Sequence, residues 1–417
     1  MTIQHIIQQW ALSNDFLHNR MSFICGPRQI GKTTLVQNHL KKLKQEEHYH
    51  NWDSIHLKQK FAKNPLFFLE TLKKTIPPGG YIDDKERQWV VFDEIHKYLK
   101  WKNLLKGYYD ELRNSLRFVI AGSARLDFFR ASGDSLVGRY FLSRMYPLHP
   151  NDMTGKSICF SDVWHPKSNH FHLESSPTEY QEACTYLLNL SGFPEPVSIG
   201  TQTFYRRWQN EHIALITQED LRDLSKITNI SKLQTLVYLL PERVSSTLSL
   251  NNIRQTLECS HGTVQNWLNA LKLVYVLFEV PPYSQKISRS IRKNKKYYFW
   301  DWGLVNDSGK RFENFIAVQL LRAISAWNEW GLGNYACYFV RTKDGKEVDF
   351  LIAENELPVM LIECKKSDTS FSSHLSYFKD RLGAKIAVQV IEKSNIIKQV
   401  ASDSYVISAD CFLQMLP

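Results

Sequence analysis

The nonapeptide GPRQIGKTT, residues 26–34, has the residue types and spacing of a phosphate-binding loop. Gly26, Gly31, Lys32 and Thr33 fill the fixed positions of the pattern G-x-x-x-x-G-K-[ST]. Glycines let backbone N–H groups turn toward phosphate oxygens, and a helix after the loop adds a favourable dipole. Lys32 would reach the β- and γ-phosphates of ATP, and Thr33 would give a hydroxyl ligand to Mg²⁺. The residues expected to contact the nucleotide are Gly26, Pro27, Arg28, Gln29, Ile30, Gly31, Lys32, Thr33 and Thr34.

A pair of carboxylates, Asp93 and Glu94, follows the apolar run WVVF. Open α/β sheets bind ligands at the carboxyl ends of their strands. Asp93 would hold Mg²⁺ there, directly or through water, and Glu94 would orient and deprotonate the attacking water. Such a pair alone is as readily a solvated strand end. After a complete phosphate loop it favours ATP hydrolysis over a small-molecule kinase, which seldom needs a base aimed at water.

Two further residues are candidates for the same ATPase site. Ser123, in AGSA, follows the next apolar run and could position the lytic water, or could belong to a tight Gly-Ser turn. Arg139, in VGRY, could contact the γ-phosphate of a neighbouring subunit as an arginine finger, or could be a surface arginine.

A second constellation lies in the last part of the chain, with Asp349 in EVDF and Glu363 and Lys365 in IECKK. If the two segments are neighbouring antiparallel strands, the carboxylates of Asp349 and Glu363 converge and can bind Mg²⁺. Residues i and i+2 share a face of a strand, so Lys365 joins them and could stabilise charge on a phosphate. The alternative is a sheet face on which Lys365 only neutralises two carboxylates. The order of predicted elements here resembles the PD-(D/E)XK nuclease fold, and this resemblance adds Glu313 as a further metal ligand.

The elements that must position the first site alternate between strand and helix, which is typical of a parallel α/β sheet. Apolar runs and turn signals predict a leading helix over 3–12 and then the following elements. The strands are 21–25, 55–57, 89–92, 116–121 and 140–146, and the helices are 32–44, 65–75 and 99–114.

The middle of the chain is predicted to be helical, with helices over 180–190, 203–217 and 220–224 that would form a lid. Arg206 or Arg207 could touch phosphates from it, although a solvated helix face explains both. Three more helices, over 233–240, 250–257 and 262–273, precede extended stretches at 275–280 and 296–300, as in a winged helix. The hairpin tip is well placed for DNA phosphates, although such modules also bind proteins. Its basic residues are Lys286, Arg289, Arg292, Lys293, Lys295 and Lys296.

The elements expected around the second constellation are a helix followed by three strands, a helix and a strand. They cover 309–327, 337–341, 347–353, 358–366, 373–382 and 385–390.

Length and composition fit a multidomain protein with an anionic partner. The chain has 417 residues, too many for one ordinary core, and a net charge of +10, which favours nucleic acid or a surface kept basic for solubility. The seven Cys form no C-x-x-C pair, which predicts a reducing, cytoplasmic environment. We expect no signal peptide, and no run approaches the ~18–20 apolar residues of a membrane span.

The motifs GPRQIGKTT, WVVFDE, AGSA, GRYFLSRMYPLHP and SGFPEP together resemble a family of bacterial and archaeal AAA+-type ATPases with a C-terminal nuclease-like domain. The resemblance implies a P-loop, AAA+-like α/β domain (1–150), a helical lid (151–230), a winged-helix domain (231–305) and a restriction-endonuclease-like α/β domain (306–417). Residues 156–177 match no motif, and a metal site at His165, His170 and His172 is disfavoured because it lacks Cys and helical spacing.

Two functions follow. The first is an ATPase that couples ATP turnover to DNA binding or to metal-dependent DNA cleavage. The second is an ATP-dependent switch whose C-terminal domain only docks DNA or protein. Proteins of this type often act as dimers or rings, so a homo-oligomer is expected under either function.

Overall fold

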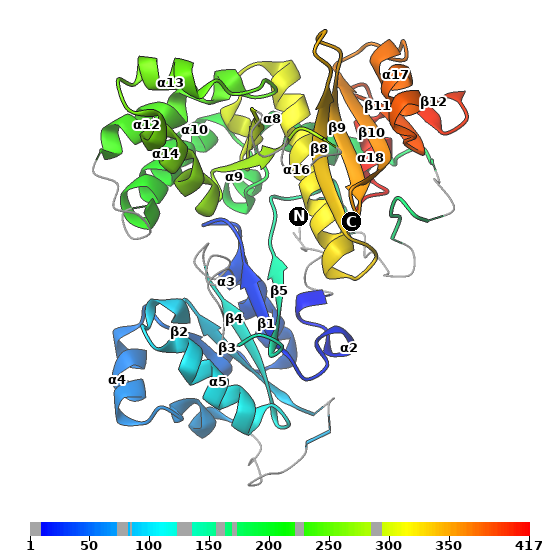
Figure 1. Cartoon of the computed structure of the whole chain (residues 1–417). Coiled ribbons are helices and arrows are strands. Elements are labelled where there is room, and N and C mark those ends of the chain that lie inside the picture. Colours follow the sequence, from blue (N-terminus) through cyan, green and yellow to red (C-terminus); the bar gives the residue numbers. More distant parts are fainter. Residues whose placement is uncertain are drawn as a thin grey trace. The chain divides into compact units, whose positions relative to one another are not determined.

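The computed structural model describes residues 10–72, 82–83, 86–122, 136–155, 163–168, 173–221, 229–284 and 294–417. Internal contacts divide the chain into an N-terminal unit, Gln4–Tyr146, and a C-terminal unit built on Pro147–Pro417 (Figure 1). Among the described residues, no helix combines the length and the apolar character needed to cross a membrane.

A five-stranded parallel sheet forms the centre of the N-terminal unit, with strand order β2-β3-β4-β1-β5. β1, β3 and β4 are buried along their whole length, as expected for parallel strands covered on both faces. This confirms the predicted α/β class. The strands are β1 (Met21–Cys25), β2 (Tyr49–Asn51), β3 (Gln88–Asp93), β4 (Leu116–Ala121) and β5 (Tyr140–Arg144).

Two predictions for the N-terminal unit are wrong, one of a strand and one of a helix. The predicted strand over 55–57 is wrong, because Ser54 caps a helix there and its side chain accepts a hydrogen bond from the Leu57 amide (3.3 Å). The predicted helix over 65–75 is only a 3₁₀ turn within the described residues, and most of the predicted helix over 3–12 lies outside them. The helical elements are α2 (Asn14–Leu17), α3 (Lys32–Leu43), η1 (Glu46–His48), α4 (Ile55–Lys63), η2 (Phe67–Thr71), η3 (Ile95–Lys97) and α5 (Trp101–Leu112).

The C-terminal unit opens with helices and one hairpin. Asn229, Ser249 and Ser260 each cap a helix by accepting a backbone N–H, which explains why the three helices before the hairpin begin where they do. The helices are α7 (Pro150–Thr154), α8 (Thr178–Asn189), α9 (Pro194–Ile199), α10 (Gln202–Leu215), η5 (Ile216–Asp220), α12 (Ile230–Leu239), η6 (Pro241–Arg243), α13 (Leu250–Thr256) and α14 (His261–Leu273). The antiparallel hairpin is β6 (Leu277–Val280) with β7 (Lys296–Phe299).

A six-stranded mixed sheet follows, in the order β12-β13-β11-β10-β9-β8. β8, β9 and β10 are antiparallel, whereas β10, β11 and β13 run parallel. The long helix α16 packs against β8 and β10, and α17 packs against β9, β10 and β11 (Figure 1). The elements are η7 (Trp302–Leu304), α16 (Ser308–Glu329), β8 (Tyr335–Arg341), β9 (Glu347–Glu354), β10 (Leu357–Lys365), α17 (Ser373–Leu382), β11 (Ile386–Ile391), β12 (Ile397–Ala401), β13 (Ser404–Ser408) and α18 (Ala409–Leu413).

The SGFPEP motif contributes to a buried polar joint. The Asp301 carboxylate, just after β7, accepts hydrogen bonds from the Ser191 hydroxyl (2.9 Å), the Tyr205 hydroxyl (2.8 Å) and the Gly303 amide (3.1 Å). A Cβ on Gly192 would lie 2.3 Å from the Trp302 ring, so only glycine fits there. The joint therefore fixes the end of β7 against α8 and α10.

Asp301 should make stability depend on pH. Burial raises its pKa to about 6, against about 3.9 for an unfolded Asp. Between these two pKa values the folded chain binds a proton at Asp301 more readily than the unfolded chain does. The stabilisation from this proton is therefore present at low pH and is lost as pH rises through about 6. Relative to Asp301→Asn, we expect the wild-type free energy of unfolding to fall by about 2 kcal/mol between pH ~4.5 and ~7. Denaturant titrations of both proteins across this range check this, and parallel curves would contradict it.

A buried ion pair joins α7 to α16. The Arg322 guanidinium contacts both oxygens of Asp152, at 2.9 Å for Nη2 to Oδ1 and closer for Nη1 to Oδ2. Asp152 Oδ2 also accepts the His149 amide (2.9 Å). Both charged side chains are almost completely buried. The PLHP motif, which contains His149, thus contributes a backbone N–H to this buried ion pair.

Candidate functional site

The loop between β1 and α3 has the backbone that its glycines allow. Gly26 and Gly31 have φ of 147° and 95°, and Gln29 also adopts a positive φ, 60°. A Cβ on Gly26 would lie 2.7 Å from the Met145 carbonyl oxygen, so the loop requires glycine at this position. The Lys32 ammonium donates to the carbonyl oxygens of Gly26 (3.0 Å) and Pro27 (2.6 Å). The predicted phosphate-contacting residues therefore form one compact loop around Lys32.

The loop meets the acidic end of β3 although β4 lies between β1 and β3 in the sheet. The Thr33 hydroxyl donates to Asp93 Oδ2 (2.7 Å), and the Tyr49 hydroxyl donates to the same oxygen (2.7 Å). Burial raises the pKa of Asp93, whereas both hydrogen bonds favour its ionised form. Thr33 and Asp93, the two predicted Mg²⁺ ligands of this site, are thus in direct contact.

Glu94, the second carboxylate of the pair, has other side-chain partners than Asp93 has. It has a left-handed conformation, φ 58°, and its amide donates to the Ala121 carbonyl (2.9 Å). Its carboxylate lies 3.4 Å from the Lys97 ammonium and 3.6 Å from His96 Nε2. A non-glycine residue in this conformation at a strand end is often a functional residue. Its role as base stays a prediction.

The remaining candidates for the ATPase site have different outcomes. Ser123 lies outside the described residues. Arg139 makes two contacts with Asp110 of its own chain, at 2.9 Å and 3.2 Å. Arg206 is exposed, and Arg207 pairs with Glu211 on the same helix. A phosphate contact by any of these arginines stays a prediction. Tyr49 was missed, because a tyrosine starting a short strand carries no recognisable signal.

The second constellation is assembled on β9 and β10. The pair Ile362↔Phe350, continued by one residue, sets Glu363 opposite Asp349. Asp349 Oδ2 accepts the Cys364 amide (3.0 Å), and Glu363 contacts the Lys365 ammonium (2.8 Å). The structure thus brings Asp349, Glu363 and Lys365 together on neighbouring strands.

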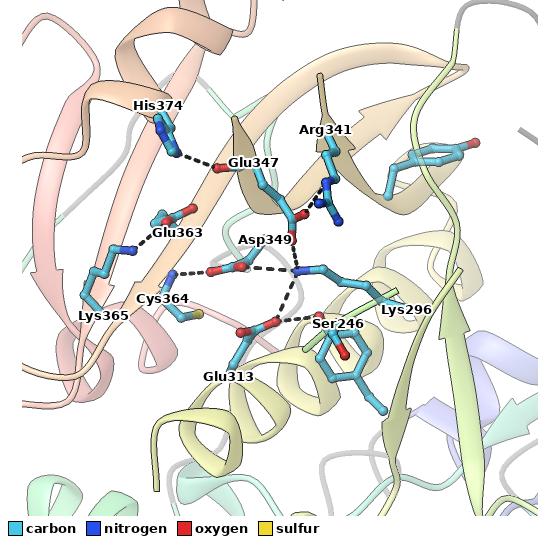
Figure 2. Close-up of polar contacts among 12 residues, drawn as sticks. Ser246, Lys296, Glu313, Arg341, Glu347, Asp349, Glu363, Cys364, Lys365 and His374 are labelled. Atoms are coloured by element: carbon cyan, nitrogen blue, oxygen red, sulfur yellow. Dashed lines mark hydrogen bonds and ion pairs between the residues drawn. The ribbon is translucent and has the colours of Figure 1, made fainter. Parts of the chain in front are cut away.

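Lys296, the first residue of β7, also lies in this cluster (Figure 2). Its ammonium is 2.6 Å from Glu347 Oε1, 3.3 Å from Asp349 Oδ1 and 3.5 Å from Glu313 Oε1. The prediction that Lys296 belongs to a basic surface for DNA phosphates is wrong, since its side chain is 0% exposed. Alternation along β7 turns it inward, where carboxylates stabilise its charge.

Of the other basic residues of the hairpin tip, the structure describes Lys295. Lys295 pairs with Glu279 (2.6 Å) and is half-buried. Lys286, Arg289, Arg292 and Lys293 lie outside the described residues.

Hydrogen bonds connect β7, which carries Lys296, with α16, which carries Glu313. The Tyr298 hydroxyl donates to Glu313 Oε1 (2.7 Å). The Asn314 side chain accepts the Phe299 amide (2.8 Å) and donates to the Phe299 carbonyl (2.7 Å). These bonds attach β7 to α16.

The electrostatics of the cluster follow from burial and from mutual repulsion. Burial and the Asp349 charge raise the pKa of both Glu313 and Glu363. Although burial disfavours its charged form, Glu313, Asp349 and Glu347 raise the pKa of Lys296 above its ordinary value. Glu363 is 5% exposed, and its Oε2 has no hydrogen-bond partner among the residues that the structure describes. An orphaned, buried carboxylate oxygen fits a cation or a proton.

Within the described ranges, no three His, Cys, Asp or Glu side chains are arranged to hold a metal ion. Figure 2 shows Asp349 between the Lys296 ammonium and the Glu363–Lys365 pair. Glu313, Asp349 and Glu363 would be the Mg²⁺ ligands if the metal binds, and this assignment stays a prediction. Glu347, Arg341 and Lys296 were missed as members of the site. The period-2 alternation Glu347–Asp349 was the available signal.

The histidine-containing segment 156–177 is described only in part. His165 Nδ1 lies 3.3 Å from the Tyr335 hydroxyl, and the Trp164 carbonyl accepts the Trp327 indole N–H (2.8 Å). His170 and His172 lie outside the described residues.

Three family models match consecutive parts of the chain. The first, described as an AAA domain, matches residues 18–153. The N-terminal unit is therefore similar to AAA-type P-loop domains. Two domains of unknown function, DUF8612 and DUF4143, match residues 181–312 and 308–412.

Two proteins are similar over much of the chain. An uncharacterized protein of Haemophilus influenzae is 22% identical over 378 residues, 86% of each chain. Uncharacterized protein MJ1637 of Methanocaldococcus jannaschii is 23% identical over 291 residues, which span 66% of this chain and 59% of that protein.

Solved structures show a more distant likeness. The Orc1 protein of Aeropyrum pernix, in complex with DNA, is 11% identical over 76% of this chain and 91% of its own, with a TM-score of 0.33. Cdc6p of Pyrobaculum aerophilum is 14% identical over 68% and 89%, with a TM-score of 0.26. Such scores lie below the level at which two chains share an overall arrangement.

Proposed function

We propose that the N-terminal unit binds Mg²⁺-ATP and hydrolyses it. The contact of 2.7 Å between the Thr33 hydroxyl and Asp93 carries this proposal, because it joins the loop that would hold phosphates to the carboxylate that would hold the metal. Lys32 would bind the β- and γ-phosphates, and Glu94 would orient and deprotonate water. Ser123 would position that water, and Arg139 would contact the γ-phosphate bound by a neighbouring subunit.

For the C-terminal unit, the function supported best is metal-dependent cleavage of DNA, controlled by ATP turnover. Asp349 and Glu363 face each other on neighbouring strands, Lys365 contacts Glu363, and one buried Glu363 oxygen has no partner within the described part of the chain. Mg²⁺, when bound, would supply a Lewis acid for a phosphodiester and lower the pKa of a water. Lys365 would stabilise the charge that develops on the phosphate. The net charge of +10 favours DNA as the partner.

The alternative is a switch whose C-terminal unit docks DNA or protein without cleaving it. The position of Lys296 favours this alternative, because its buried ammonium already forms ion pairs with Asp349, Glu313 and Glu347. A salt-bridged cluster of this kind can be purely structural.

One set of assays separates the two functions. Purified full-length protein is incubated with DNA and Mg²⁺ or Mn²⁺, with and without ATP, beside Lys32→Ala, Lys365→Ala and the neighbouring control Lys366→Ala, whose ammonium bonds Ser308. Cleavage that is lost in Lys365→Ala, kept in Lys366→Ala and altered in Lys32→Ala supports an ATP-controlled nuclease. ATP hydrolysis without cleavage under every condition supports the docking alternative.

A further inference from the structure

Lys296 differs from the other basic residues of the acidic cluster in how completely it is enclosed. Its side chain is 0% exposed, whereas Lys365 and Arg341 are 41% and 48% exposed. Burying an ammonium is costly unless carboxylates surround it, and three lie within 3.5 Å. The Phe339 ring lies beside it, with the ammonium 5.6 Å from the ring centroid. The enclosed lysine is thus a built part of the site.

The backbone that carries Lys296 is fixed on several sides. Lys296 pairs with Val280 in the hairpin and forms a bridge with Thr247. Further along β7, Phe299 is bonded to the Asn314 side chain of α16, the helix that also carries Glu313. The ammonium therefore keeps its place by more than its own ion pairs.

We propose that Lys296 is a built-in cation that competes with divalent metal ions for the carboxylates of the acidic site. This inference rests on the proposed metal-dependent function, because two of the predicted Mg²⁺ ligands, Asp349 and Glu313, are the carboxylates that Lys296 contacts. Four carboxyl groups, Glu313, Glu347, Asp349 and Glu363, already face the basic groups of Lys296, Arg341 and Lys365. A metal ion entering this nearly balanced cluster meets the repulsion of a buried ammonium, which the low local dielectric strengthens. Lys296 thus sets how readily the site takes up a metal.

The test is calorimetric titration of the full-length chain with Mn²⁺ in the absence of nucleotide. Lys296→Met removes the charge and keeps the length of the side chain, Lys296→Arg keeps the charge, and Lys295→Met is the matched control on the neighbouring lysine. We expect Lys296→Met to bind Mn²⁺ at least about tenfold more tightly than the wild type. Lys296→Arg and Lys295→Met should bind like the wild type, and adding Asp349→Asn to Lys296→Met should abolish the gain. Folded Lys296→Met without any gain overturns the inference.

The outcomes separate this inference from the proposed nuclease. Tighter, Asp349-dependent binding without DNA cleavage by any variant supports the inference and contradicts the nuclease. The wild type could instead bind Mn²⁺ through Asp349 and cleave DNA, with both properties unchanged in Lys296→Met. That result supports the nuclease and contradicts the inference.

A second measurement needs no variant that must fold. Amine labelling of the wild type, read by mass spectrometry, should modify Lys296 more slowly than half-buried Lys295. Mn²⁺ should raise the labelling of Lys296, because a bound metal displaces the ammonium, and leave Lys295 unchanged. Labelling of Lys296 that Mn²⁺ leaves unchanged contradicts the competition.

Discussion

Glu94→Gln should bind ATP as the wild type does and hydrolyse it about 10²–10⁴-fold more slowly. Glutamine keeps the size of the side chain but cannot accept a proton from the attacking water. Glu94 has a left-handed backbone and its carboxylate contacts Lys97 and His96, whereas the Asp93 carboxylate is engaged by Thr33 and Tyr49. Nucleotide affinity by fluorescence titration and phosphate release at saturating ATP measure the two effects separately.

The matched control for Glu94→Gln is Asp53→Asn. Asp53 contacts the same Lys97 ammonium as Glu94 does, at 2.7 Å, but is half exposed. Asp53→Asn should leave the rate of ATP hydrolysis within about twofold of the wild type, because removing an exposed ion-pair partner has little effect. Equal rates for Glu94→Gln and wild type, with Lys32→Ala inactive, would remove Glu94 from the mechanism.

Asp152→Ala should lower the free energy of unfolding of the C-terminal unit by about 3–5 kcal/mol. The substitution leaves the Arg322 guanidinium, which is 4% exposed, without its two-oxygen partner. It also removes the acceptor of the His149 amide at the start of α7. Denaturant titration followed by circular dichroism measures the loss.

Two variants test whether the uncompensated charge causes that loss. Asp152→Leu combined with Arg322→Met removes both charges and should recover a large part of the stability, since a buried pair can be replaced by apolar side chains at low cost. Glu211→Ala breaks the exposed pair with Arg207 and should change stability by no more than about 1 kcal/mol. A loss in Asp152→Ala as small as that in Glu211→Ala would show that the buried pair contributes little.

Most of the N-terminal sheet could be predicted because β1, β3 and β4 are mainly apolar and buried along their whole length. The predictions for β1, β3, β4 and β5 agree with the structure to within a few residues. The prediction of the second strand failed because IHL at residues 55–57 alternates like a strand, whereas the Ser54 cap starts a helix there. β2 itself, Tyr49–Asn51, is too short and too polar to give a signal.

The C-terminal sheet shows where strand patterns succeed and where they end. β9 and β10 were predicted nearly to the residue, and their register follows from the carboxylate positions and the short turn between them. β12 was not predicted, because it is exposed along its whole length and lacks an apolar pattern, and its mostly buried partner β13 was not predicted either. Propensity alone does not identify such an edge strand.

The largest gap between sequence and site concerns Lys296. In the sequence it ends a run of basic residues, and such runs usually face solvent. Its partners Glu347 and Asp349 come more than 50 residues later, so only the fold reveals the ion pairs. Long-range pairing of this kind has no local signature.

The contribution of β7 to the acidic site bears on how this protein can have been assembled from parts. The family match over 308–412 covers the four carboxylates, whereas Lys296 and Tyr298 belong to the match over 181–312. A segment beginning at residue 308 would inherit the four acids without the lysine that contacts three of them. Recombination that moved this segment alone would leave Glu313, Glu347 and Asp349 without their buried ammonium, so we expect that moving the hairpin with the segment keeps these charges paired.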